Sequence, residues 1–283
     1  MQVFRSYGDM LEYIRRNVVD EVFVHLSSQT NLPINKIIKE LEVMGVTVDL
    51  NINVFEMEIP VQREIERIGN YYTVSFSPKI HSFKQIFFKR VMDIVGAIVG
   101  LLITGIVTVF LAPALLIESP GPLFFSQVRV GKNGRRFKIY KFRSMYMDAE
   151  ERKKELMSQN EMEGLMFKME NDPRVTKVGK FIRKTSIDEL PQFWNILKGE
   201  MSLVGTRPPT EDEFLQYEGY HRRRLNMTPG LTGLWQVSGR SDTKNFEEIV
   251  AMDVEYIDNW SLKEDIKILF KTVGVVLKGK GAS

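Results

Sequence analysis

The chain has 283 residues, and its 39 basic side chains are nearly balanced by 36 acidic ones. Hydrophobic residues make up 43% of it, an ordinary globular composition that excludes wholesale disorder and a polytopic membrane protein. The sequence has no cysteine and three histidines, so disulfides, thiolate zinc sites and cysteine nucleophiles are excluded, and a histidine-rich metal site is disfavoured.

The first 80 residues predict part of an α/β domain. Residues 21–26 are typical of a buried strand, residues 33–44 carry apolar side chains at helical spacing, and residues 46–50 alternate as a second strand. This order indicates a parallel βαβ unit, which needs further elements to complete a stable sheet. We interpret residues 71–83 as a linker.

Residues 94–117 form an uncharged apolar run that is long enough to cross a bilayer core. Basic residues flank both of its ends, whereas a simple crossing would place them mainly on the cytoplasmic side. Pro113 lies inside the run and can break a helix. We therefore expect a helix-break-helix over about residues 91–117 that enters and leaves by the same face. A single kinked crossing is the alternative.

The rest of the chain predicts a mixture of strands and helices. Residues 123–130 and 136–142 are typical of the two strands of a hairpin, with Lys132-Asn133-Gly134 at its turn. Helices are expected over residues 148–167, 189–198 and 246–259. Residues 266–277 fit a helix in the membrane interface, with a core helix as the alternative.

An acidic dyad, Asp188-Glu189, is the main candidate for chemistry. Pro191 suits the first turn of a helix, so the dyad is expected at a helix N-terminus, close to Arg183. A carboxylate can attack phosphorus or carry a divalent metal that neutralises phosphate oxygens. The alternative is structural, because Ser186-x-x-Glu189 also matches a capping box.

A second candidate is Arg207, which lies between a glycine turn and two prolines. A stiffly held guanidinium suits bidentate contact with phosphate, although an exposed loop arginine is the alternative. The basic hairpin with its aromatic residues could bind RNA by stacking and phosphate contact. Beside an apolar segment, anionic lipid headgroups are the favoured partner.

These motifs, in this order, resemble the bacterial sugar transferase family, the polyprenyl-phosphate hexose-1-phosphate transferases or monotopic phosphoglycosyl transferases. The matching segments are Lys89-Arg90-x-x-Asp93, residues 119–125, Tyr140 to Met145, Asp172-Pro173-Arg174, Thr185 to Gln192, Gly205 to Pro208 and Pro229 to Gly233. Two departures are Ala112-Pro113, where the family often has Ser-Pro, and Thr206-Arg207-Pro208, where it often has Pro-Arg-Pro.

The resemblance implies an α+β fold: a monotopic membrane protein with a re-entrant helix-break-helix and a cytosolic catalytic domain, preceded by a partial Rossmann-like α/β segment. The domains would be residues 1–80 and 81–283. We expect the chain to be the C-terminal part of a longer protein, located at the bacterial inner membrane with its catalytic domain facing the cytosol.

The resemblance also implies an activity. A hexose-1-phosphate passes from a UDP-sugar to polyprenyl (undecaprenyl) phosphate through a phosphosugar intermediate on Asp188, with release of UMP, in the assembly of a surface glycan. Glu189 assists, and Asp188 also holds Mg²⁺. The implied substrate-binding residues are Arg207, Pro208, Arg183, Lys141, Arg143 and Gln192.

The implied partners are the two substrates and inner-membrane phospholipid, with a second copy of the chain as a candidate and no nucleic acid. Glucose and galactose are the favoured hexoses. The alternative to an enzyme is a non-catalytic scaffold or regulator anchored to the membrane.

Overall fold

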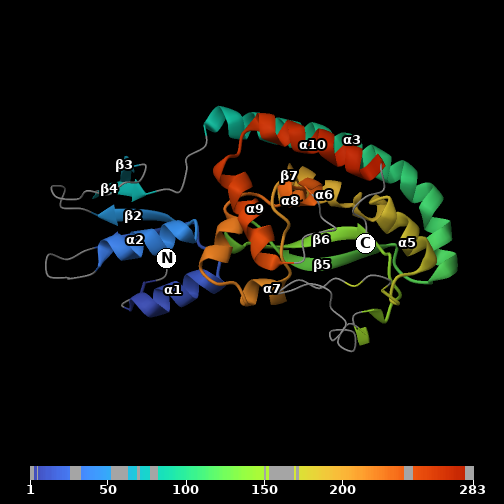
Figure 1. Cartoon of the computed structure of the whole chain (residues 1–283), viewed down its shortest axis with the longest axis horizontal. Coiled ribbons are helices and arrows are strands. Elements are labelled where there is room, and N and C mark those ends of the chain that lie inside the picture. Colours follow the sequence, from blue (N-terminus) through green and yellow to red (C-terminus); the bar gives the residue numbers. More distant parts are fainter. Residues whose placement is uncertain are drawn as a thin grey trace.

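The computed structural model of the chain describes residues 3–4, 6–25, 33–51, 63–68, 71–76, 82–149, 151–152, 169, 172–238 and 245–277. An α/β unit comes first and is followed by one very long helix, α3, which arches over a mixed unit of helices and strands (Figure 1). Most of the helix predicted over residues 148–167 lies outside the described residues.

The N-terminal unit has two helices and a four-stranded sheet of order β1-β2-β4-β3. Its elements are α1 (Tyr7–Arg16), β1 (Glu21–His25), α2 (Ile34–Val43), β2 (Thr47–Asn51), β3 (Arg63–Ile68) and β4 (Tyr71–Phe76). The pairing of β1 with β2 is parallel, with α2 between them, which confirms the predicted βαβ unit. The pairs β2–β4 and β3–β4 are antiparallel, and the description as Rossmann-like stays a prediction.

The linker predicted over residues 71–83 is wrong for its first half, because Tyr71–Phe76 forms β4. Two tyrosines, a threonine, a valine and a phenylalanine in six positions favour a strand. This strand and β3 supply the extra elements that the βαβ unit needed.

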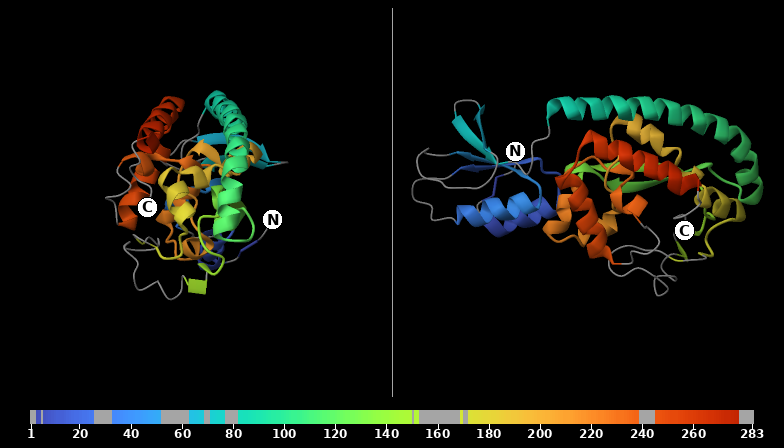
Figure 2. Two further views of the ribbon diagram at one scale, coloured as in Figure 1. Left: turned by 90° about the vertical axis from the view of Figure 1, so that its right-hand side faces the viewer. Right: turned by 45° about the horizontal axis from the view of Figure 1, so that its top comes forward.

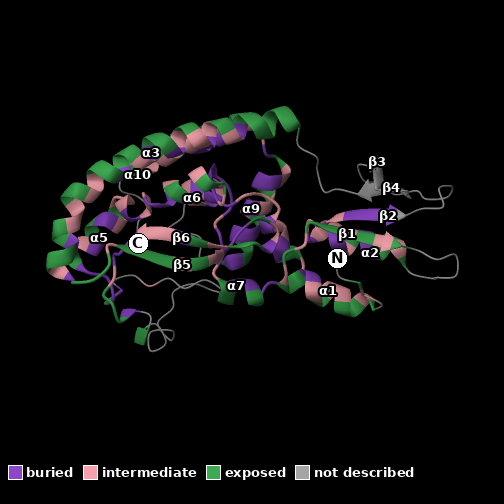
Figure 3. Ribbon diagram, turned by 180° about the vertical axis from the view of Figure 1, so that it is seen from behind, coloured by how far each residue is buried: buried purple, intermediate pink, exposed green. Residues whose placement is uncertain are grey.

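Helix α3 runs from Phe83 to Glu118 and is the one helix among the described residues that is long and apolar enough to cross a membrane. Only 17% of its most apolar 18-residue window is buried within the protein, whereas the core helix of a soluble protein would be mostly buried. Exposed apolar side chains occur along its length, Phe83 and Phe110 among them, and exposed residues are seen from one end of the helix to the other (Figure 3).

The break expected at Pro113 is not an interruption, because α3 is assigned as helix through that residue. The helix instead curves, and its second half turns down around the end of the unit that it covers (Figures 1 and 2). Thr104 and Thr108 each donate to the carbonyl four residues earlier, at 2.7 Å in both cases, a bond that often bends helices.

The unit beneath α3 is built from a hairpin, a short parallel pair of strands and several helices. They are β5 (Phe124–Val130), η1 (Lys132–Gly134), β6 (Arg136–Phe142), α5 (Lys177–Lys184), η3 (Ile187–Glu189), α6 (Gln192–Lys198), β7 (Ser202–Val204), α7 (Glu211–Leu215), η4 (Tyr220–Leu225), β8 (Gly230–Thr232), α8 (Leu234–Ser238), α9 (Phe246–Asp258) and α10 (Leu262–Leu277). The hairpin is confirmed, and Asn133 at its turn has a positive φ of 54°. The helix predicted over residues 246–259 is α9.

Helix α10 lies beside α3 on the surface (Figure 2). One face of α10 packs in the core, as the core-helix alternative predicts, and its placement in a membrane interface stays a prediction. Asp265 and Ile268 are fully buried, whereas Phe270 is 76% exposed and Val273 is also exposed. Together α3 and α10 present a broad apolar surface.

The N-terminal unit docks on the hairpin turn. The Asp20 carboxylate accepts hydrogen bonds from Asn133 and Arg135. From η4, the buried Arg222 donates to the carbonyls of Asn17, at 2.8 Å, and Asn133, at 3.4 Å. The hairpin turn and η4 therefore attach the N-terminal unit to the unit beneath α3.

Close packing of α3 on α6 depends on Gly100, and we expect Gly100→Ala to be destabilising. A Cβ at this position would lie 2.3 Å from the ring of Phe193, so the two helices would have to separate, at a cost of about 1–3 kcal/mol. Gly105→Ala on the same helix is the matched control, because its Cβ would have no neighbour within 4 Å. Thermal unfolding in detergent should show a lower midpoint for Gly100→Ala only. Equal midpoints would contradict this account of the contact.

Candidate active site at the start of helix α6

The acidic dyad lies in the 3₁₀ turn η3, directly before α6. The predicted helix over residues 189–198 is thus confirmed in its main part, with Pro191 as the N-cap of α6. Asp188 is buried, with 7% of its surface exposed. Ser186 has a left-handed backbone, φ 56°, and its side chain makes no capping hydrogen bond. The capping-box interpretation of Ser186 is therefore wrong, and the strained conformation places the dyad on a tight turn.

Helix α3 holds both helices that flank the dyad. Arg90 donates to the carbonyls of Ile196 and Leu197, each at 2.8 Å, and so binds the C-terminal end of α6. The carboxylate of Glu118, at the end of α3, accepts the backbone N–H groups of Lys177 and Val178 at the start of α5. The helix dipole favours both contacts, because a positive charge lies at the C-terminus of α6 and a negative charge at the N-terminus of α5.

The turn itself also contacts α3. The hydroxyl of Thr104 lies 3.2 Å from the carbonyl oxygen of Leu190, the residue that follows the dyad. The site is therefore built directly against the apolar helix.

Helix α6 in turn positions the hairpin. Asn195, which is fully buried, donates to the carbonyl of Lys138 at 2.7 Å and accepts the N–H of Tyr140 at 3.2 Å. This contact fixes β6 so that Lys141 donates to the Glu189 carboxylate, with Nζ 2.7 Å from Oε1. Both side chains are largely covered, so the pair is better defined than a surface salt bridge.

Arg183 completes the group around the dyad. Its Nε donates to Ser144 Oγ at 2.9 Å. Burial lowers the pKa of Arg183, and the nearby carboxylate of Asp188 acts in the opposite direction. We call Asp188, Glu189, Lys141 and Arg183 the dyad cluster. These four predicted residues are brought together by the fold.

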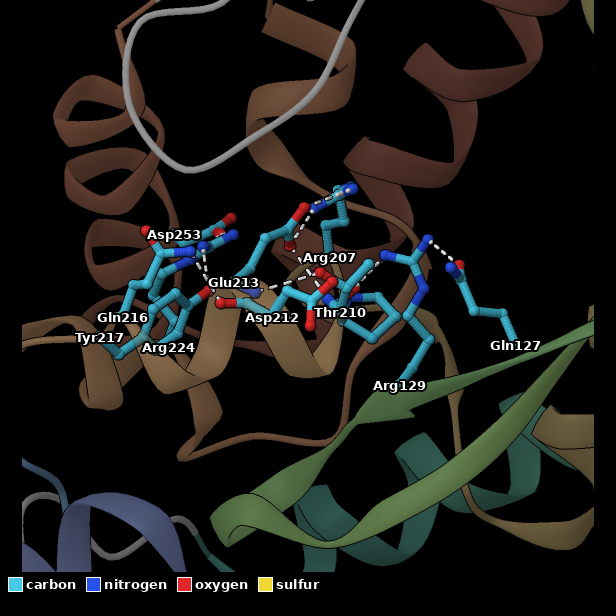
Figure 4. Close-up of polar contacts among 11 residues, drawn as sticks. Gln127, Arg129, Arg207, Thr210, Asp212, Glu213, Gln216, Tyr217, Arg224 and Asp253 are labelled. Atoms are coloured by element: carbon cyan, nitrogen blue, oxygen red, sulfur yellow. Dashed lines mark hydrogen bonds and ion pairs between the residues drawn. The ribbon is translucent and has the colours of Figure 1, made fainter. Parts of the chain in front are cut away.

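Arg207 belongs to a neighbouring group. Its guanidinium donates to both oxygens of Glu213, at 3.1 and 3.4 Å (Figure 4). Glu213 and Thr210 form a capping box at the start of α7. Burial raises the pKa of the Glu213 carboxyl, but Arg207 and Arg129 outweigh it and hold that pKa below its usual value. We call Arg207, Glu213 and Arg129 the arginine cluster.

The three remaining predicted site residues are buried within the fold. Arg143 is buried and donates to the carbonyls of Ser119 and Pro120, just beyond the end of α3. Pro208 is buried, and its carbonyl accepts a hydrogen bond from Arg129 at 3.2 Å. Gln192 is buried as the first residue of α6. Contact of these three with substrate stays a prediction.

Sequence reasoning missed Arg129, Glu213 and Ser144. The pattern Thr210-x-x-Glu213 is a readable capping-box signal, and the capping box forms there and not at Ser186. Nothing local marks Arg129, because its surroundings come from a loop 79 residues further along the chain.

This architecture is an α+β protein with one long apolar helix and a carboxylate dyad, of which Asp188 is buried, close to several cations. The chain belongs to the Bacterial sugar transferase family, which matches it over residues 84–279.

The chain is similar to several curated proteins. It is 51% identical over 266 residues to the galactosyl transferase CpsE of Streptococcus agalactiae, covering 93% of this chain and 59% of CpsE. It is 46% identical over 200 residues to the undecaprenyl-phosphate galactose phosphotransferase of Salmonella typhimurium, covering 69% of this chain and 42% of that protein. The exopolysaccharide production protein ExoY of Rhizobium meliloti is 41% identical over 198 residues, covering 69% of this chain and 87% of ExoY. The chain thus spans about half the length of the first two relatives.

Proposed function

We propose that this protein transfers a hexose-1-phosphate from a UDP-sugar to polyprenyl phosphate in the synthesis of a surface polysaccharide. The observation that carries the proposal is the dyad cluster: a buried carboxylate, Asp188, beside Arg183, with its neighbour Glu189 held by Lys141, directly under α3. Membership of the family and the names of the relatives support the same activity.

The proposed reaction has two displacements at phosphorus. A carboxylate oxygen of Asp188 attacks the phosphorus next to the sugar, and the bond from this phosphorus to the bridging oxygen breaks, so that UMP leaves. An oxygen of the polyprenyl phosphate then attacks the same phosphorus and Asp188 leaves, which gives the polyprenyl-diphosphate sugar. A covalent intermediate lets a soluble and a lipid substrate use one site in turn. The cations of the dyad cluster neutralise charge on the phosphoryl oxygens.

We propose Mg²⁺ as the cofactor, held by Asp188. Among the described residues there is no group of three or more acidic or histidine side chains that could form a complete metal site. One or two carboxylates fit magnesium well, because this ion usually completes its shell with water and substrate phosphates. When bound, it would neutralise phosphate oxygens during transfer.

Galactose is the first hexose to test, since three of the relatives carry it in their names. Another relative is named as a glucose-1-phosphate transferase. The assay mixes the protein with undecaprenyl phosphate, magnesium and one UDP-sugar at a time, and measures UMP. Release with UDP-galactose that needs the lipid supports the proposal. No UMP release with any UDP-sugar would favour a non-catalytic scaffold.

We also propose that α3 is re-entrant and that the site faces the cytosol at the inner membrane. The support is the curvature of α3 and the basic residues on both of its flanks (Figure 2). The apolar faces of α3 and α10 would lie in the membrane, and the dyad cluster directly beneath α3 would meet a cytosolic nucleotide sugar at headgroup height.

Single cysteines should show this topology. We expect Ser82→Cys, before α3, and Lys132→Cys, at the hairpin turn, both to resist a membrane-impermeant thiol reagent in intact cells and to react after lysis. Both positions are exposed, and the chain has no native cysteine, so this protein gives no background. Labelling of one position only in intact cells would indicate a true crossing.

A further inference from the structure

Arg129 on β5 is a partly buried arginine whose hydrogen-bond partners are neutral. Its terminal nitrogens donate to the side-chain oxygen of Gln127, at 2.7 Å, and to the carbonyl of Pro208, at 3.2 Å. Its Nε is buried and has no hydrogen-bond partner among the described residues. A buried donor without a partner costs about 1–3 kcal/mol, and more when it is charged.

The hairpin register places Arg129 on the same face as Lys141. Phe125 pairs with Lys141 and Arg129 with Phe137, and alternate residues along a strand share a face. Lys141 binds Glu189, and Glu189 is also one of the carboxylates that act on the charge of Arg129. Arg129 therefore lies between the dyad cluster and Arg207.

Cations outnumber carboxylates at this position. Arg129 and Arg207 share Glu213, which makes its hydrogen bonds to Arg207 and to the backbone of Thr210 (Figure 4). Glu189 is paired with Lys141. Burial and then repulsion from Arg207 lower the pKa of Arg129 to about 10, so it remains a cation at neutral pH.

A purely structural role does not account for a charged group here. The backbone already joins β5 to the loop that carries Arg207, through the Arg129–Thr210 bridge and the bond from Val130 N–H to the Pro209 carbonyl at 3.0 Å. A charge taken partly out of water without a directly bonded carboxylate is unfavourable, and the two carboxylates that act on Arg129, Glu213 and Glu189, are bonded to Arg207 and Lys141. An anionic ligand between the two clusters would supply the missing negative charge.

We propose that Arg129 is a substrate-binding residue that, together with Arg207, holds a phosphate group of one of the two substrates next to the dyad. This inference rests on the proposed function and adds a residue outside the motifs that suggested it. The phosphate is that of the nucleotide sugar or that of the lipid, and the two sources are separated by measurement.

The test compares Arg129→Gln and Arg129→Lys with Lys138→Gln in the full chain in detergent. Lys138 is an exposed cation on the same hairpin, and it pairs with Val128 on the opposite face, so its change controls for the loss of one positive charge. Calorimetry measures the Kd for UDP, and steady-state assays measure the KM for undecaprenyl phosphate. Thermal unfolding checks that each variant is folded; if the Gln variant does not fold, the Lys variant decides.

For UDP, we expect Arg129→Gln to raise the Kd about 10- to 100-fold, the scale for hydrogen bonds to charged groups. Arg129→Lys should give a smaller rise, because it keeps the charge but loses the planar fork. Lys138→Gln should stay within about twofold. An unchanged Kd with an equivalent rise in the KM for undecaprenyl phosphate would support the site and assign the phosphate to the lipid.

Unchanged Kd and KM in a folded Arg129 variant would overturn the inference and leave the proposed function standing. A wild-type chain that neither binds UDP nor releases UMP would instead overturn the proposed function, and the inference with it.

Discussion

Replacing Asp188 by asparagine is expected to abolish sugar-phosphate transfer, with a loss on the order of 1,000-fold or more in kcat. The amide is nearly the same size as the carboxylate, so the buried position in η3 stays filled. However, it is a poor nucleophile and carries no charge for a magnesium ion. UMP release at saturating substrates measures the effect, and thermal unfolding shows whether the variant keeps its fold.

Trapping of the intermediate makes this prediction specific for the covalent route. Wild-type protein, incubated without lipid with a UDP-sugar labelled in the hexose, should retain label after denaturation, and Asp188→Asn should not. Asp212→Asn is the matched control, because Asp212 is an exposed aspartate on α7. Near-normal turnover by Asp188→Asn would rule out the phosphosugar-aspartate.

Glu189→Gln separates the two members of the dyad. The change removes the charge of Glu189 and weakens its ion pair with Lys141. We expect a severe loss of UMP release. If Glu189 assists the reaction and is not itself the nucleophile, the labelled hexose should still be trapped on Asp188. Because Ser186 forms no side-chain cap, a mere loss of helix capping is not the expected result.

Much of the site could be predicted because its motifs are local. The pair Asp188-Glu189 before Pro191 marks the start of α6. Lys132-Asn133-Gly134 marks the hairpin turn, where the tight turn requires a positive φ and Asn133 adopts it. The contacts between these segments were not predictable from spacing. Lys141 meets Glu189 only because Asn195 of α6 binds the backbone of β6.

Other features depend on residues far apart in the sequence. Strands β7 and β8 have three residues each and pair with one another across a long connection. Each is too short to show the alternation of apolar and polar residues that identifies a strand in a sequence. The partial burial of Arg129 and the curvature of α3 are also set by packing. Residues 71–76 are different, because their aromatic and β-branched residues favour a strand in the sequence itself.

A buried ion pair explains the first part of the Lys89-Arg90-x-x-Asp93 motif. Lys89 Nζ lies 2.7 Å from Asp265 Oδ2, and the two side chains are 10% and 0% exposed. Lys89 also donates to the carbonyl of Val204 at 2.9 Å. Asp265 further accepts the hydroxyl of Tyr256, at 2.6 Å, and the indole N–H of Trp260, at 3.1 Å. The pair thereby joins α3, α10 and β7 at one point.

Asp93 makes a parallel connection one turn further along α3. Its carboxylate accepts the hydroxyl of Ser202 and the N–H of Leu203, both at 2.9 Å. The polar residues of the motif thus attach the apolar helix to the strand that precedes Arg207.

Asp265→Asn is expected to lower the free energy of unfolding by about 3–5 kcal/mol, the cost of leaving a buried charge without its partner. All three side-chain partners of this carboxylate are donors, so the new amide N–H₂ must face a donor. At about 2–4 °C per kcal/mol for a unit of this size, the unfolding midpoint in detergent should fall by roughly 6–20 °C.

Glu264→Gln is the matched control, since it makes the same chemical change one residue earlier in an exposed pair with Lys267. Exposed pairs contribute about 1 kcal/mol or less, so its midpoint should stay near that of wild type. Adding Lys89→Met to Asp265→Asn should regain part of the lost stability, because the unpaired charge is then gone. Equal midpoints for Asp265→Asn and Glu264→Gln would mean that the buried ion pair between Lys89 and Asp265 adds nothing measurable to stability.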